Sequence, residues 1–408
     1  MTCQQAPDLT LSPCRRAAIF MVGALEVLLF GGAVFGWPQL VHLLKMDSVF
    51  ADLCNDVNTA AGPGINKYEA VPQGEIFNNS RCMALNATPV FLPGHKVGVE
   101  QCAPQDEMFA LIFTLAVGCY GIPSFLVGFL LHHAGLWPTR ISAGAMLCVG
   151  FIFLGITTKE SPYWLFPAMM LLALGGNQLR MSGLQFADMF PAHKATALTL
   201  LASMFSTSAS LFLVFQLAER YHIERSIICW CLAGLSTFVL WMTFIMPPHH
   251  IPCHDDYDKS GVGEHDELTL SYSYNTGGVA VKEVQELSLL RALVTLSSIL
   301  LQVWLTANLL AVNIYQLTYN YWITIVSCTT DEAELFSILY SCVNFISVFV
   351  DLLEIRSTIF PLAFTTVCTF CMYLLLLFFH PVGVYCSLVF MALTRPCVVA
   401  VATAFVRI

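Results

Sequence analysis

The sequence has few charged residues and lacks the short motifs that mark common enzyme sites. Only 11% of its 408 residues are Asp, Glu, Lys or Arg, against roughly 25% in soluble domains. It contains no GxSxG, HExxH or P-loop sequence, so the chemistries that those motifs serve are not indicated. No basic stripe accompanies the net charge of −9, which argues against nucleic-acid binding. We predict a protein that is not an enzyme and needs no cofactor.

Metal-binding patterns are missing as well. The stretch Cys253-His254-Asp255-Asp256 lies in an acidic linker and lacks the ligand spacing of a zinc site. Sixteen cysteines would be enough for a disulfide framework, but most lie in apolar stretches, where a cysteine acts as a small hydrophobic residue. Examples are Cys119, Cys148, Cys229, Cys231, Cys368 and Cys371. We predict no metal site.

Apolar residues are abundant instead: 57% of the chain is hydrophobic and the mean hydropathy is +0.71. A membrane-crossing helix needs about 20 predominantly apolar residues, and the first such run is too long for a cleavable signal region. Candidate spans fall near residues 17–44, 108–131, 141–158, 163–190, 195–218, 227–246, 292–317, 335–355, 357–379 and 384–406. We predict an all-α polytopic membrane protein with about ten transmembrane helices, six before a long polar break and four after it.

Two long polar insertions indicate the orientation in the membrane. Residues 45–107 contain the sequons Asn78-Asn79-Ser80 and Asn86-Ala87-Thr88, and asparagines in such sequons are glycosylated only in the lumen or outside the cell. We therefore predict that Asn78 and Asn86 are glycosylated in an extracellular loop. The N-terminus and the acidic residues 247–290 are then cytosolic, and the basic residues of the short segments favour this orientation modestly.

Four cysteines share the oxidising side in this topology: Cys54, Cys82, Cys102 and Cys328. A Cys54–Cys102 disulfide is the preferred pairing, because it would join the two ends of the first loop. Sequence alone does not determine connectivity, and one bridge with free thiols elsewhere remains an equal alternative.

Ionisable residues are rare within the predicted spans. Glu26 lies in the first span, Arg180 in the fourth, and Arg395 in the last, where it could extend toward one membrane face. Such residues usually face a cavity or a partner. One hypothesis is that Glu26 and Arg180 bind the amine and the carboxylate of a zwitterion. The favoured alternative is a salt bridge between them, because opposite charges in a low dielectric pair when geometry allows.

Amide and aromatic residues within the spans suggest a second kind of ligand. Amides can bond to the edge of a planar heterocycle and Trp can stack on its face, which makes candidates of Gln185, Gln302, Trp304 and Asn313. For any single residue, helix association through hydrogen bonds is the commoner role. The fifth span has several small hydroxyl residues, for which close helix packing is favoured over a polar cavity wall: Ser203, Ser206, Thr207, Ser208 and Ser210.

Three stretches together resemble solute carrier family 43, a branch of the major facilitator superfamily: "LEVLLFGGAVFGWPQLV", "CAPQDEMFALIFTL" and "MPPHHIP". That family contains large neutral amino acid uniporters and an equilibrative nucleobase transporter, and "FGWP", "GLQFADMF" and "QVW" are more similar to the latter. Residues that match the family pattern are Glu26, Gln185, Gln302, Trp304 and Asn313.

The resemblance implies sodium-independent facilitated transport of a small neutral solute by alternating access at the plasma membrane. Purine nucleobases are the favoured substrates. An amino acid uniporter is the second reading. The implied partners are a small-molecule substrate and membrane lipid, and nothing indicates a protein partner. Carriers of this superfamily have twelve helices, so the expected organisation is a cytosolic N-terminus (1–16), a six-helix bundle (17–246), a cytosolic linker (247–290) and an incomplete four-helix bundle (291–408). A third reading is thus a non-transporting paralogue or fragment with a regulatory role.

The segment "VGFLLHHAGLWPTR" (127–140) resembles the gating loop of these carriers, whose pattern is Gly-x-x-x-Asp-Arg-x-Gly. Gly128 and Gly135 keep the spacing, His132 and His133 replace the charged pair, and Arg140 retains the basic end. This loop supplies too few ligands for a metal. We interpret the histidines as an altered hinge, with a pH-dependent latch as the less favoured alternative.

Overall fold

The computed structural model describes residues 13–54, 103–190, 194–246, 295–326, 335–336, 338–340, 342, 359–378 and 380–405. Every secondary-structure element within these ranges is a helix. The all-α prediction is therefore confirmed for the described part of the chain. Three predicted features lie outside it: the sequons at Asn78 and Asn86, the acidic linker, and Cys102.

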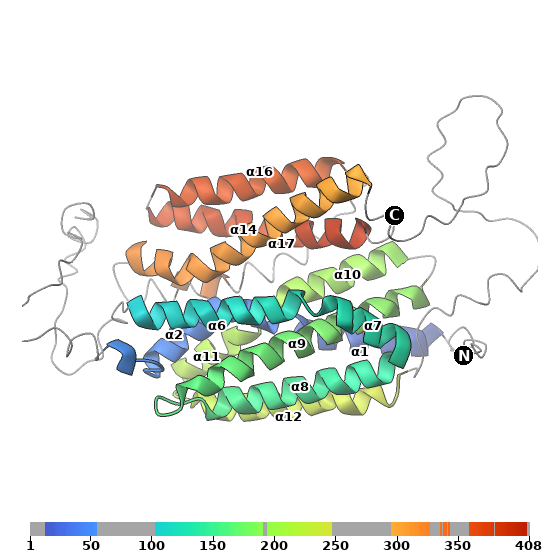
Figure 1. The fold of residues 1–408 in the computed structure, drawn as a ribbon, viewed down its shortest axis with the longest axis horizontal. Helices are drawn as coiled ribbons and strands as arrows, with labels where there is room; N and C mark the ends of the chain where they lie inside the picture. Colours follow the sequence, from blue (N-terminus) through green and yellow to red (C-terminus); the bar gives the residue numbers. More distant parts are fainter. Residues whose placement is uncertain are drawn as a thin grey trace, which may run out of the picture.

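The helices form two groups (Figure 1). The first, called the N-terminal group here, consists of α1 (Pro13–Glu26), η2 (Val27–Gly31), η3 (Ala33–Gly36), α2 (Trp37–Met46), α6 (Ala103–Gly121), α7 (Ser124–Ala134), α8 (Leu136–Ile156), η4 (Pro162–Trp164), α9 (Leu165–Leu184), η5 (Gln185–Met189), α10 (Lys194–Thr207), η7 (Ser208–Phe212), α11 (Leu213–Arg220) and α12 (Arg225–Thr243). The second, the C-terminal group, consists of α14 (Leu296–Val326), α16 (Ile359–Leu376) and α17 (Pro381–Phe405). The groups touch where α17 packs on α10 and α14 on α2.

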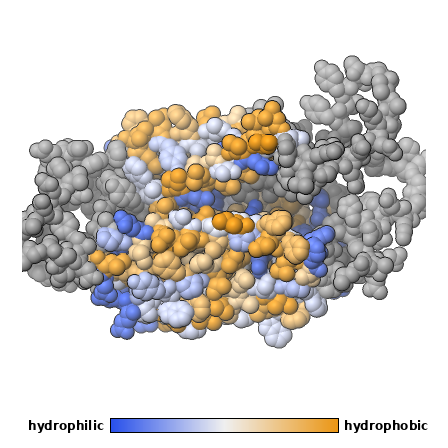
Figure 2. All heavy atoms as spheres, viewed as in Figure 1, coloured by the Kyte–Doolittle hydropathy of each residue, from blue (hydrophilic) through white to orange (hydrophobic). Residues whose placement is uncertain are grey.

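Nine of the ten predicted spans coincide with described helices, and the tenth, 335–355, lies mostly outside the described residues. Among the described residues, five helical stretches could each cross a membrane by length and composition: Pro104–Ala134, Leu136–Ile156, Thr196–Phe215, Arg225–Thr243 and Ser298–Tyr319. A sixth candidate is the pair Cys14–Gly31 and Ala33–Met46, bent by 42°. Hydrophobic side chains cover much of both groups in Figure 2, and hydrophilic ones appear in the hollow between them.

The bent first span approaches the fifth span very closely. A Cβ added at Gly36 would lie 2.4 Å from the Ala209 carbonyl oxygen, and one at Gly32 would lie 2.9 Å from the Phe205 carbonyl oxygen. The backbone amide of Gly32 also donates to the Ser208 hydroxyl. Only glycine fits such contacts. The prediction that small residues of the fifth span serve close helix packing is confirmed here for Ser208.

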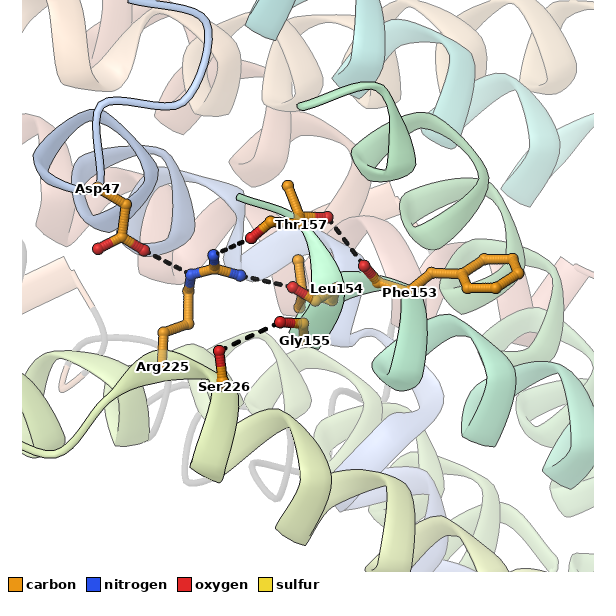
Figure 3. Close-up of polar contacts among 7 residues, drawn as sticks. All are labelled: Asp47, Phe153, Leu154, Gly155, Thr157, Arg225 and Ser226. Carbon is orange, nitrogen blue, oxygen red and sulfur yellow. Dashed lines mark hydrogen bonds and ion pairs between the residues drawn. The ribbon is translucent and has the colours of Figure 1, made fainter. Parts of the chain in front are cut away.

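A buried arginine that the sequence did not single out joins three elements at one end of the N-terminal group (Figure 3). Arg225, the first residue of α12, donates to Asp47 (2.6 Å) and to the carbonyls of Leu154 and Thr157. Those carbonyls lie at the C-terminal end of α8, where helical carbonyls have no partner within the helix. Arg225 therefore caps α8 and ties it to the end of α2.

The cysteines of the apolar stretches are free thiols, as predicted. Cys54 is disulfide-bonded, and its partner lies outside the described residues. The pairing with Cys102 therefore stays a prediction.

Candidate functional site

Glu26 forms a buried ion pair, but its partner is not the predicted one. The side chain of Glu26, at the end of α1, accepts from Arg140 of α8, and both residues are almost completely buried. The predicted salt bridge between Glu26 and Arg180 is therefore wrong. Arg140 also does not lie in the predicted gating loop, because this residue lies inside α8 with its guanidinium 5.5 Å from the Phe186 ring centre.

The Glu26–Arg140 pair is incompletely hydrogen-bonded. Within the described residues, Oε1 of Glu26 and both Nε and Nη1 of Arg140 have no hydrogen-bond partner. A buried pair recovers its desolvation cost only when its remaining polar atoms are also satisfied. The pair is therefore sensitive to the loss of either member, and it does not leave Glu26 available as the amine-binding half of a zwitterion site.

Arg180 belongs instead to a second cluster. This half-buried residue of α9 places its guanidinium 4.5 Å from the ring centre of Phe205 in α10. The Tyr120 hydroxyl from α6 lies beside it and donates to the Gly31 carbonyl oxygen (3.2 Å). No carboxylate in the described part of the chain pairs with Arg180.

The C-terminal group contributes Arg395 to the same cluster. Its guanidinium lies 5.3 Å from the Phe35 ring centre and 5.8 Å from that of Phe205. Arg395 is only 5% exposed, so it does not extend toward a membrane face as the sequence allowed. The two arginines therefore share the Phe205 ring, one from each helix group.

Three aromatic rings complete this cluster. Phe35 meets Tyr120 and Phe205 edge-on at centroid distances of 5.1 and 5.9 Å, and Tyr120 lies 6.1 Å from Phe205. We call these five residues the cationic aromatic cluster: Phe35, Tyr120, Arg180, Phe205 and Arg395. Aromatic faces attract guanidinium cations, which holds both arginines at the boundary between the groups.

The predicted amides fall in two places. Gln185 begins η5 and is buried, and its Oε1 has no hydrogen-bond partner among the described residues. The neighbouring amides of α9 join helices: Asn177 donates to Ser124 (2.9 Å), and Gln178 accepts from Ser142 (2.8 Å). Helix association therefore accounts for these two hydrogen bonds, and among the described residues Oδ1 of Asn177, like Oε1 of Gln185, has no hydrogen-bond partner.

The α14 residues lie apart from the charges of the N-terminal group. Trp304 donates to Thr366 of α16 (2.9 Å), Gln302 is exposed, and Asn313 is half-buried. Within the described residues, no hydrogen bond, ion pair or ring contact joins any of the three to Glu26 or Arg180. The structure thus does not assemble the predicted binding residues into one site.

The predicted gating residues surround the junction of α7 and α8. Gly135 links the two helices with φ 89°, a conformation that favours glycine. His132 and His133 lie in the last turn of α7 and are exposed, with ring centroids 5.1 Å apart, and the His133 ring stacks on Phe129 at 4.0 Å. The described residues contain no group of His, Cys, Asp or Glu side chains that could hold a metal. A role of the histidines in gating stays a prediction.

Comparison with known proteins identifies relatives among transporters. The chain is 26% identical over 238 residues to equilibrative nucleobase transporter 1 of Bos taurus, a match that covers 58% of this chain and 42% of the relative. It is 22% identical over 238 residues to large neutral amino acids transporter small subunit 3 of Homo sapiens, covering 57% and 37%. The Mus musculus protein of that name is 20% identical over 258 residues, covering 62% and 40%. No family model matches the chain.

These relatives confirm the resemblance that the sequence motifs indicated, and they are transporters rather than enzymes. Together with the apolar helices, they support a multi-pass, all-α membrane protein. The matched region spans about two fifths of the length of each of these relatives.

Proposed function

Because its homologues are transporters of solute carrier family 43, we propose that this chain is a facilitative, sodium-independent transporter of nucleobases, with purine nucleobases as the favoured substrates. The observation that supports this most is the match to equilibrative nucleobase transporter 1. The cationic aromatic cluster is consistent with such a role, because it places polar and aromatic side chains at the boundary of two helix groups. Ionisable residues inside a membrane protein commonly mark a substrate pathway.

The chemistry of the described residues suits a flat heterocycle. The rings of Phe35, Tyr120 and Phe205 offer faces on which a base can stack. The free Oε1 of Gln185 is an acceptor for a donor on the edge of a base. Transport then proceeds by alternating access, in which the two helix groups move relative to each other around the substrate.

The proposed setting is the plasma membrane, with a cytosolic N-terminus and an extracellular loop glycosylated at Asn78 and Asn86. Treatment of intact cells with a glycosidase tests this directly. A mobility shift that disappears when both asparagines are replaced by Gln supports the topology. An unchanged mobility in the wild type contradicts it.

Uptake measurements test the proposed function. Cells expressing the full chain are given labelled adenine with and without excess unlabelled adenine, and surface delivery is checked by biotinylation. We expect saturable adenine uptake that is unchanged when sodium is replaced by choline. If the protein reaches the cell surface but adenine is not taken up, the nucleobase proposal is contradicted. If leucine uptake is also missing, a non-transporting role is favoured.

A second candidate is a large neutral amino acid uniporter. It is favoured by Arg180, whose guanidinium has no carboxylate partner within the described residues and could bind the carboxylate of an amino acid. It is disfavoured by Glu26, because the charge of this carboxylate is already paired with Arg140. Labelled leucine uptake without adenine uptake would select this candidate.

A further inference from the structure

We propose that the cationic aromatic cluster binds a planar aromatic anion, so that the preferred substrate is a negatively charged heterocycle rather than a neutral base. This inference rests on the proposed transport function and names the substrate class of the same protein. It follows from three features of the cluster: its positive charge, its aromatic rings, and the contribution of residues by both helix groups.

The first argument is electrostatic. Arg180 and Arg395 approach the same ring, at 4.5 and 5.8 Å from its centre. Arg180 has no carboxylate partner among the described residues, and the buried carboxylate of Glu26 is held by Arg140. Two cations near one ring in a low dielectric both contribute to a positive potential there. An anion gains from that potential, whereas a neutral ligand does not.

The second argument concerns shape. Three rings surround the guanidinium groups, and Phe35 stands at 70° to Tyr120 and at 83° to Phe205. Aromatic faces bind flat ligands by stacking, and a guanidinium binds an anionic oxygen pair through parallel N–H groups in one plane. The combination favours a ligand that is both flat and anionic over a small aliphatic acid.

The third argument is that the cluster is divided between the helix groups. Arg180 comes from α9 of the N-terminal group, and Arg395 comes from α17 of the C-terminal group. The helix α17 packs on α10 of the N-terminal group. An anion that contacts both guanidiniums therefore stabilises the approach of the two groups. Binding would thus favour the closed arrangement through its differential affinity for that state.

The test uses the full chain reconstituted in lipid nanodiscs and equilibrium binding of labelled urate, a planar purine with one negative charge at neutral pH. Labelled adenine serves as the planar neutral probe, and acetate as an anionic competitor without a ring. We expect urate to bind, excess adenine to compete at least tenfold less well than urate, and acetate not to compete. No urate binding, or adenine competing as well as urate, overturns the proposal.

Variants identify the residues involved. Arg180→Gln should weaken urate binding at least tenfold, and Arg180→Lys should recover part of the loss because the charge is kept. The matched control is Lys194→Gln, which removes an exposed cation of the same group that pairs with Asp188 and should leave urate binding unchanged. Thermal unfolding verifies that each variant is folded. Equal effects of Arg180→Gln and Lys194→Gln on urate binding overturn the assignment.

Binding and uptake together separate this inference from the proposed function. Adenine uptake in cells without urate binding to the reconstituted chain leaves the transport proposal standing and overturns the anion site. Urate binding that depends on Arg180, with no uptake of urate or adenine, supports the anion site and contradicts transport.

Discussion

The two helix groups are held together by different kinds of polar contact. In the N-terminal group, ion pairs connect separate helices: Glu26 with Arg140, and Asp47 with Arg225. In the C-terminal group, neutral contacts do so, such as Tyr315 with Ser387 and Asn308 with Thr369. Arg395 is the only Lys, Arg, Asp or Glu within the described part of α14, α16 and α17, and it faces the rings of the other group.

This difference separates structural charges from candidate functional ones. The Glu26–Arg140 and Asp47–Arg225 pairs stay within the N-terminal group and fix its helices relative to one another. Arg180 and Arg395 contact aromatic rings at the boundary between the groups, where a transporter must change its contacts during the cycle. We infer that the N-terminal group is the more rigid of the two, and four predictions test this comparison.

The largest expected effect comes from breaking the buried pair of the N-terminal group. Glu26→Gln leaves Arg140 charged and without its partner, which should cost about 3–5 kcal/mol. We expect a strongly lowered melting temperature and little chain at the cell surface. The double variant Glu26→Gln with Arg140→Gln should be more stable than either single variant, since each single variant leaves a lone buried charge and the double variant leaves none.

The control for that prediction is Lys159→Gln, which removes the exposed partner of Asp52 at 3.9 Å. Exposed pairs contribute at most about 1 kcal/mol, so its melting temperature should match the wild type. A Glu26→Gln variant as stable as Lys159→Gln would contradict the structural role of the buried pair.

Arg225→Gln should have the next largest effect. It removes the ion pair with Asp47 and leaves the carbonyls of Leu154 and Thr157 without their donor, which should cost about 2–3 kcal/mol. Arg225→Lys should recover only part of the lost stability. The ammonium group of Lys lacks the planar set of donors with which the guanidinium group reaches three acceptors. Thermal unfolding in nanodiscs measures both. If Lys restores full stability, charge alone would explain the contact.

Close packing within the N-terminal group provides the third test. Gly36→Ala forces its Cβ against the Ala209 carbonyl oxygen, and overpacking of this kind costs about 1–3 kcal/mol. Gly128→Ala is the matched control, because nothing lies within 4 Å of an added Cβ there. We expect Gly36→Ala to lower the melting temperature and Gly128→Ala to leave it unchanged or raised. The reverse order would refute the contact between η3 and η7.

The smallest effect is expected in the C-terminal group. Tyr315→Phe removes the hydrogen bond to Ser387 (2.9 Å), and hydrogen bonds between membrane helices are worth about 0.6 kcal/mol. The melting temperature should fall only slightly. A loss as large as that of Arg225→Gln would remove the distinction between the two groups.

Some of the site could be foreseen from the sequence and some could not. Charges within apolar runs drew attention to Glu26, Arg180 and Arg395, because such residues are costly in a membrane. Their partners could not be foreseen: Arg140 follows a gating motif and was expected in a loop, yet the helix α8 begins at Leu136 and carries it inside. Arg225 gave no signal, since an arginine at the start of a span usually faces water.

Composition and local pattern alone determined that this is an all-α membrane protein, that most of its cysteines are free, and that its fifth span packs closely through small residues. These properties depend on hydropathy and side-chain size, which are read position by position. Only the tertiary structure decided that Glu26 pairs with Arg140 and that Arg180 and Arg395 share Phe205. Which charges meet depends on the rotation and depth of helices far apart in the chain, and those are set by packing across the whole assembly of helices.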